Sequence, residues 1–180
     1  MAASKEPFEI RGTLDLVNGH RILRLEQESS DQLSSRGQVA LDLLGDFAGR
    51  TVVIDPDGRR GHWLDLHAEQ APELEGEIGQ QFHLSVQPSS SWPETAVPAD
   101  LAEALGEASD LDETWVGLTP MARWEWVRWV GSTKNPDTRQ RRVEVSISKL
   151  RDGKRRPCCF DLSSCTNPEL AKSGKLIQQG

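Results

Sequence analysis

The chain has 180 residues, 36% of them hydrophobic and 27% charged, and a formal net charge of −7. This length suffices for one sizeable domain or two small ones, and the composition is typical of a globular protein. No apolar run approaches the roughly 18 residues that a membrane-spanning helix needs, and residues 1–8 lack the apolar core of a secretory signal.

The net charge hides an uneven distribution of acidic and basic residues along the chain. Residues 1–120 contain 8 Lys and Arg against 22 Asp and Glu, a net charge of −14. Residues 121–180 contain 13 against 6, a net charge of +7. Such asymmetry indicates either two modules with different partners or two oppositely charged parts that attract each other. The sequence alone leaves both interpretations open.

Alternation of apolar and polar residues predicts β-strands through the first 90 residues. Val39, Leu41 and Leu43 alternate with their neighbours, as residues of a half-buried strand do. Asn18-Gly19 is a hairpin turn signal, and Asp55-Pro56-Asp57-Gly58 is a turn because proline presets φ and glycine accepts a positive φ. The predicted strands lie at residues 8–16, 22–25, 39–44, 52–54, 63–66 and 82–86.

An internal repeat runs through the predicted strands. Leu23-x-Leu25 followed by Val39-x-Leu41-x-Leu43 has a counterpart in Leu64-x-Leu66 followed by Phe82-x-Leu84-x-Val86, at offsets of 41 to 43 residues. A duplicated unit of this kind can close into a small barrel, which removes exposed sheet edges. The alternative is coincidence among leucine-rich strands.

Residues 88–98 are predicted to form a linker because they are rich in proline and serine. Sequence signals for helices follow this linker. Pro98, Thr119-Pro120 and Asn135-Pro136 each suit the first turn of a helix, while Ser109 suits the cap of a shorter one. Gly153 is suited to end the last helix. The predicted apolar faces are Leu101, Ala104, Leu105 and Ala108; then Ala122, Trp126, Trp129 and Val130; then Val143, Ile147 and Leu150.

Standard catalytic signatures are absent from the sequence. There is no G-x-S-x-G, no phosphate-binding G-x-x-x-x-G-K-[ST], no dinucleotide-binding G-x-G-x-x-G and no H-E-x-x-H. The four histidines all lie in the strand region, far along the chain from the cysteines. We therefore expect a protein that is not an enzyme and that needs no cofactor.

Cys158, Cys159 and Cys165 are the candidate metal ligands. Structural zinc takes about four ligands, whereas only three thiols are present, two of them adjacent, and no histidine follows residue 83. We interpret the cysteines as small, partly buried apolar side chains and not as a metal site. An odd number of thiols without an export signal also indicates a reduced, cytoplasmic setting.

A basic stretch in the last predicted helix is the predicted partner-binding surface. Arg139 and Arg142 lie three residues apart on that helix, and guanidinium groups bind phosphate or carboxylate in a bidentate fork. Lys134 adds a third cation. Trp124, on the face opposite the other tryptophans of its helix, either covers the linker or anchors a partner. The alternatives for the basic stretch are a solvated face and a face that docks on the acidic part of the chain.

Two parts of the chain resemble known families. The pattern Trp129-Val130-x3-Lys134-x3-Thr138-Arg139-x2-Arg142-Val143, followed by Leu150 and Gly153, is similar to the helical module of the bacterial YdeI/OmpD-associated (OmdA) family. Thr133, Asp137 and Val143 stand where that family usually has Ala, Glu and Ile. The upstream part resembles a small barrel domain of unknown function that is often fused to this module. Its matching features are Leu44-Gly45-x-Phe47, Asp57-Gly58, His62-Trp63-Leu64, Trp92-Pro93 and Val97-Pro98-x-Asp100-Leu101-x3-Leu105.

The resemblance implies a double-split β-barrel like that of AbrB- and MraZ-like transcription factors. It also implies a helical module whose family label is bacteriocin protection, or resistance to cationic antimicrobial peptides. No catalytic residues come with it. Kinship with DNA-binding barrels is analogy only, because those barrels bind through basic loops and this one is acidic.

We therefore expect an α+β fold with an acidic, pseudo-duplicated, double-split β-barrel at residues 1–90. A helical module at 91–156 and a cysteine-containing tail at 157–180 follow it. The expected function is a non-enzymatic binding or stress-protection protein of the bacterial cytoplasm, with an unidentified protein or peptide partner. Nucleic-acid binding is an alternative, disfavoured because phosphate repels the acidic remainder of the chain. An enzyme or small-ligand site between barrel and helices is the other alternative, and the sequence does not predict the oligomeric state.

Overall fold

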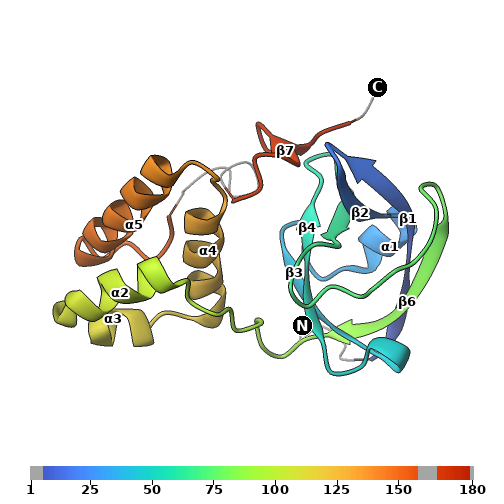
Figure 1. The fold of residues 1–180 in the computed structure, drawn as a ribbon. Helices are drawn as coiled ribbons and strands as arrows, with labels where there is room; N and C mark the ends of the chain where they lie inside the picture. The colour runs from blue at the N-terminus through green and yellow to red at the C-terminus, as the bar shows by residue number, and fades with distance from the viewer. Residues whose placement is uncertain (1–5, 158–165, 179–180) are drawn as a thin grey trace. The chain divides into compact units, whose positions relative to one another are not determined.

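A computed structural model describes residues 6–157 and 166–178 of the chain, which forms two compact units (Figure 1). The barrel unit consists of Met1–Trp92 together with Glu169–Gly180, and the helical unit consists of Pro93–Pro168. The helical unit is therefore inserted between the barrel strands and a last segment of the barrel unit. No helix in the described part is both long and apolar enough to cross a membrane.

Six antiparallel strands close the barrel in the order β1-β2-β5-β4-β3-β6, and β6 pairs back with β1. The short helix α1 (Gln27–Gln32) connects β2 to β3, and the 3-10 helix η1 (Gly45–Phe47) connects β3 to β4. A barrel followed by helices was predicted from the sequence and is confirmed. The strands are β1 (Phe8–Val17), β2 (His20–Leu25), β3 (Val39–Leu43), β4 (Thr51–Pro56), β5 (His62–Asp65) and β6 (Gln81–Pro88).

The internal repeat of the sequence reappears in the strand pairing. The order around the barrel is unchanged when β1, β2 and β3 are exchanged with β4, β5 and β6. Leu23 lies opposite its repeat counterpart Leu64 where β2 pairs with β5, and Leu43 lies opposite Val86 where β3 pairs with β6. Equivalent residues of the two copies thus meet at both junctions, as a pseudo-two-fold duplication requires. The finer double-split topology stays a prediction.

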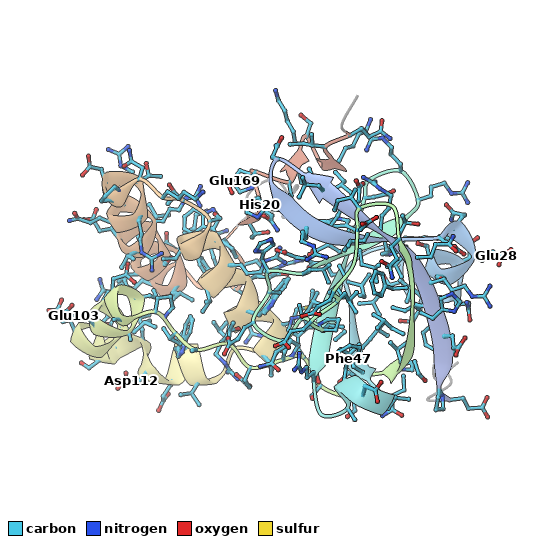
Figure 2. All side chains as sticks on the ribbon, turned by 45° about the vertical axis from the view of Figure 1, so that its right-hand side comes forward. His20, Glu28, Phe47, Glu103, Asp112 and Glu169 are labelled. Atoms are coloured by element: carbon cyan, nitrogen blue, oxygen red, sulfur yellow. The ribbon has the colours of Figure 1, made fainter. Side chains whose placement is uncertain are left out.

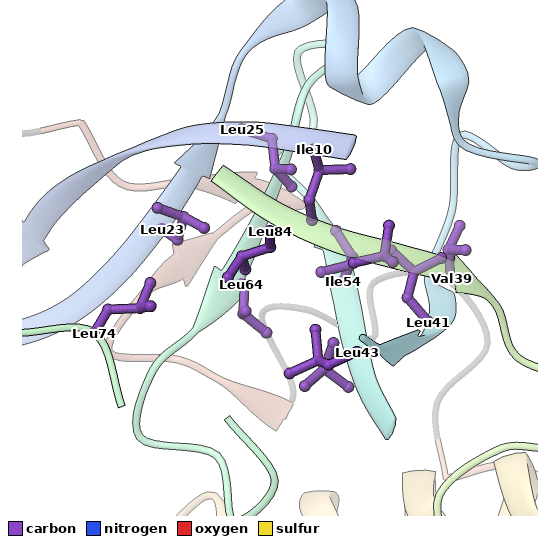
Figure 3. Close-up of a cluster of buried hydrophobic side chains, with 12 residues drawn as sticks. Ile10, Leu23, Leu25, Val39, Leu41, Leu43, Ile54, Leu64, Leu74 and Leu84 are labelled. Carbon is purple, nitrogen blue, oxygen red and sulfur yellow. The ribbon is translucent and has the colours of Figure 1, made fainter. Parts of the chain in front are cut away.

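Aliphatic side chains from all six strands fill the inside of the barrel (Figure 3). Successive strand residues point to opposite faces, so every second residue contributes to this core. Gly12 belongs to the inner row, where a Cβ atom would lie 2.7 Å from Cγ of Leu23. The buried members of the core are Ile10, Leu23, Leu25, Val39, Leu41, Leu43, Val52, Ile54, Leu64, Leu74, Leu84 and Val86.

The outer face of β1, β2 and β5 is also apolar, because Val17, Ile22 and Trp63 point away from the core and are fully buried. They are covered by residues 169–178, which we call the C-terminal strap. Leu170 and Leu176 of the strap belong to the same hydrophobic cluster. The strap is a hairpin of two short strands, β7 (Ala171–Lys172) and β8 (Lys175–Leu176).

The two longest helices of the helical unit begin at the predicted N-cap residues. In α4 (Pro120–Gly131) the Thr119 hydroxyl accepts a hydrogen bond from the Ala122 amide at 3.2 Å, and in α5 (Pro136–Arg151) the Asn135 side chain accepts one from the Thr138 amide at 3.1 Å. Three shorter elements precede them, namely α2 (Ala99–Glu107), the 3-10 helix η2 (Ser109–Leu111) and α3 (Asp112–Val116). The predicted apolar faces pack around the buried ring of Trp126 and the half-buried ring of Trp129.

His62, the first residue of β5, is a buried histidine. Its Nε2 lies 3.2 Å from the Gly37 carbonyl oxygen, and its Nδ1 has no hydrogen-bond partner among the described residues. Burial lowers the pKa of this imidazole from its ordinary 6.5, an effect that Asp57 opposes and Arg36 reinforces. His62 is therefore neutral in the folded barrel at neutral pH.

We expect His62 to make the barrel less stable in acid. As the pH falls below the ordinary pKa, His62 takes up a proton in the unfolded chain but not yet in the folded one. Protonation therefore favours the unfolded chain, and stability falls until the pH reaches the lower pKa of the folded state. His62→Gln keeps a donor for Gly37 but does not titrate. In urea unfolding it should lose less stability than the wild type between about pH 7 and pH 5. Equal losses in the two proteins would contradict the role of His62.

Candidate functional site

The boundary between acidic and basic residues falls inside the helical unit and not between the two units. Residues 93–120 contain seven acidic residues and no Lys or Arg, whereas residues 93–168 as a whole contain 11 Lys and Arg against 12 Asp and Glu. The elements α2, η2 and α3 therefore form an acidic half of the helical unit, and α4 and α5 with the residues after them form a basic half. The charge asymmetry of the sequence does not separate barrel from helices.

Two bidentate ion pairs join α5 to the acidic half. Arg139 donates from Nε and Nη2 to the two carboxylate oxygens of Asp100 at 2.6 and 2.9 Å, and Arg151 donates in the same way to Asp110 at 2.8 and 2.9 Å. The hydrogen bonds from these arginines lower the pKa of each partner carboxyl below its ordinary value. Two carboxylates of the acidic half are thus paired with two arginines of the basic half.

A third pair buries its carboxylate. Glu125 of α4 is 1% exposed, and it accepts hydrogen bonds from Nε of Arg156 at 2.6 Å and from Nη2 of the same side chain. The chain after α5 is further held by the indole nitrogen of Trp126, which donates to the Arg155 carbonyl oxygen at 3.1 Å. The basic run that follows α5 therefore packs on α4.

Arg142 closes the C-terminal end of α4. Its Nη1 donates to the Trp129 carbonyl oxygen at 2.6 Å and also binds the hydroxyl of Ser132. Carbonyls at a helix end lack partners inside the helix, so this contact satisfies one of them. The Arg142 guanidinium and the Lys149 ammonium lie 5.2 and 5.7 Å from the centre of the Trp129 ring, within the range of cation–π attraction.

Of the four residues predicted to contact a partner, Arg139 and Arg142 are thus engaged inside the helical unit. Lys134 is exposed in the connection before α5, and Trp124 is buried in α4 with the Arg128 guanidinium 4.2 Å from its ring centre. Their role in partner binding stays a prediction. Cys158, Cys159 and Cys165 lie outside the described residues, and within those no group of three His, Cys, Asp or Glu side chains is placed to hold a metal ion.

Sequence reasoning missed the carboxylates that bind these arginines. Asp100 and Asp110 lie 39 and 41 residues before their partners, too far for a helical spacing rule to connect them. The signal that could have found them is the run of acidic residues without a single cation just before a basic helix.

A shallow groove with a volume of about 180 Å³ lies in the acidic half. It is mostly apolar, and Val116 at its edge is 76% exposed, one of the exposed large hydrophobic residues of the described chain. We call it the acidic groove because Asp112 lines it and three further exposed carboxylates, Glu103, Glu107 and Glu113, belong to the same helices α2 and α3. Figure 2 labels Glu103 and Asp112. None of the four makes an ion pair or a side-chain hydrogen bond with another described residue. The groove is lined by Leu105, Gly106, Leu111, Asp112, Trp115 and Val116.

Residues 94–153 match the model of the OmdA family, whose description is Bacteriocin-protection, YdeI or OmpD-Associated. This match confirms the resemblance that the sequence indicated for the helical residues. The matched range runs from before α2 to just past α5, so it contains the acidic groove and the pairs that Arg139 and Arg151 form. The resemblance of the barrel to AbrB- and MraZ-like barrels stays a prediction. Neither the curated proteins nor the solved structures gave a match.

We expect Arg156→Met to destabilise the chain by about 3 kcal/mol, because it leaves a buried carboxylate without a partner. Arg151→Met is the matched control, since it removes an equally bidentate pair whose Asp110 is 57% exposed, and it should barely move the urea midpoint. Tryptophan fluorescence reports the unfolding. Adding Glu125→Gln to Arg156→Met should restore part of the loss. Equal shifts of the urea midpoint in Arg156→Met and Arg151→Met would contradict the expectation that the buried pair contributes more to stability than the exposed one.

Proposed function

We propose that this chain is a non-enzymatic protein of the bacterial cytoplasm that binds cationic, amphipathic peptides and thereby protects against bacteriocins. The observation that carries this proposal is the acidic groove, an apolar surface accompanied by exposed carboxylates that have no partner among the described residues. It lies within the residues that match a family described by bacteriocin protection.

The two kinds of surface in the groove suit the two faces of such a peptide. Leu105, Trp115 and Val116 offer apolar contacts, and an apolar helix face laid in a groove is a recurring mode of peptide recognition. The exposed carboxylates offer sites for lysine or arginine. The net charge of −7 attracts a cation before contact, which raises the rate of encounter.

The basic half of the helical unit is less suited to the same task. Arg139 and Arg151 already bind Asp100 and Asp110, and Arg142 already binds the end of α4. A nucleic acid or an acidic protein that bound these three arginines would have to displace their intramolecular partners. The unpaired charge that accompanies the groove is negative, which favours a cationic partner.

We expect a fluorescein-labelled helical peptide of leucine and lysine to bind the wild type with an affinity that falls as salt rises. Glu107→Gln/Asp112→Asn should weaken binding about three- to tenfold at low ionic strength, since it removes two attractive charges at or beside the groove. Fluorescence anisotropy measures both affinities. Glu73→Gln/Glu75→Gln makes the same change in net charge on the barrel unit and should bind like the wild type. Equal weakening in both variants would mean that net charge alone attracts the peptide.

A second variant separates apolar contact from charge. Val116→Asp adds a negative charge but removes the exposed apolar side chain, so we expect it to bind the same peptide at least about threefold more weakly. Ile78→Asp makes the same substitution at a barrel residue that is 53% exposed, and it serves as the control. Bacteria that express the wild type should survive a bacteriocin better than those that express Val116→Asp. Tighter peptide binding by Val116→Asp than by the wild type would rule out the groove.

A further inference from the structure

The outer face of β1, β2 and β5 carries an apolar surface that the barrel strands do not cover themselves. Val17, Ile22 and Trp63 form it, and the C-terminal strap buries it with Leu170 and Leu176. The opposite face of the same strands packs in the inner core of the barrel. The barrel therefore closes without the outer surface. In the structure this outer surface packs against a short aliphatic segment, the C-terminal strap.

Most polar contacts between the barrel and the strap are made to the strap's backbone. The amide of Leu176 donates to the Asp57 carbonyl oxygen at 3.0 Å, and Arg59 donates from Nη1 to the Leu176 carbonyl oxygen at 2.8 Å. Asn18 donates from its side-chain amide to the Glu169 carbonyl oxygen at 2.7 Å. Backbone groups are common to every segment, so these three contacts would hold another sequence in the same place.

A side-chain contact and a close backbone approach complete the surface. His20 Nε2 lies 2.7 Å from the Glu169 carboxylate, and the two side chains are labelled next to each other in Figure 2. At the hairpin turn of the strap, a Cβ atom on Gly58 would lie 2.1 Å from the Gly174 carbonyl oxygen. The surface therefore requires glycine at position 58 for contact as well as for its positive φ of 71°.

The strap itself has the character of a small cationic, amphipathic ligand. Its apolar residues face the barrel, whereas Lys172 and Lys175 are exposed on a barrel whose residues 1–92 contain 8 Lys and Arg against 15 Asp and Glu. It is two strands of two residues each, with two leucines as its fully buried anchors. Ordering so short a segment costs conformational entropy, which opposes its docking.

We propose that the outer face of β1, β2 and β5 is a docking surface for short aliphatic segments that carry lysine, and that the C-terminal strap occupies it as an exchangeable internal ligand. A tethered segment acts at an effective concentration in the millimolar range, so an added peptide competes poorly until the strap is released. The surface lies in the barrel unit and is independent of the acidic groove.

The test is binding of a labelled peptide with the sequence of residues 168–178 to the full chain. Leu170→Asp/Leu176→Asp should release the strap, and this variant should bind the peptide at least about tenfold more tightly than the wild type does. A peptide that carries the same two aspartates should not bind. No gain in affinity, in a variant whose circular dichroism and thermal unfolding show a folded barrel, would overturn the proposal.

Further variants identify the surface. Gly58→Ala added to the released chain should abolish peptide binding, while Gly49→Ala, at another positive φ of 89° but in open space, should leave it unchanged. Val116→Asp should also leave it unchanged, which separates this surface from the acidic groove. If Leu170→Asp/Leu176→Asp does not fold, Leu176→Ala takes its place in the same experiment. If Leu176→Ala binds the peptide no more tightly than the wild type does, the proposal is overturned.

Discussion

Burial of apolar side chains on both faces of β2 and β5 is the constraint on which the arrangement of the chain depends. Leu23 and Leu64 point into the barrel, and their neighbours Ile22 and Trp63 point out of it. Antiparallel strands commonly need only one apolar face, so a second one has to be covered or it stays an exposed hydrophobic patch. The C-terminal strap covers it. For that reason the chain returns to the barrel after the helices, and the helical unit is an insertion, not an appendage.

Within the helical unit, pairing of opposite charges has a comparable organising role. The acidic half precedes the basic half along the chain, and Arg139 and Arg151 join them through bidentate contacts. Such pairs contribute little to stability when exposed, but their geometry determines which charges stay available. Arg139, Arg142 and Arg151 of α5 are engaged inside the unit, whereas Glu103, Glu107, Asp112 and Glu113 of α2 and α3 have no partner among the described residues. Three cations that the sequence suggests for a partner are therefore already engaged, while exposed carboxylates accompany the groove.

Local features of the sequence predicted most of the elements. Asn18-Gly19 makes the first hairpin with both residues at positive φ, and the caps at Thr119 and Asn135 begin their helices. The repeat predicted that Leu23 and Leu64 occupy equivalent positions in the two copies, but it did not predict that they lie opposite each other in paired strands. The sequence did not predict the acidic groove, because its walls form where the successive elements α2, η2 and α3 pack and no motif marks that packing. It did not predict the strap either, since residues 169–178 show no pattern that names the barrel as their partner.

By itself the sequence determined the six barrel strands and the long helices to within a few residues, that the strands duplicate, and that acidic residues precede basic ones; it placed a turn at residues 55–58, where β4 continues through Pro56. These properties depend on neighbouring residues, whose φ preferences, caps and apolar spacing act over a few positions. Only the tertiary structure decided which arginine binds which carboxylate, which carboxylates stay unpaired beside an apolar groove, and that the last segment covers the barrel. The ion pairs and the strap depend on contacts between residues tens of positions apart or more, and the groove depends on how α2, η2 and α3 pack, which local φ preferences and caps do not specify.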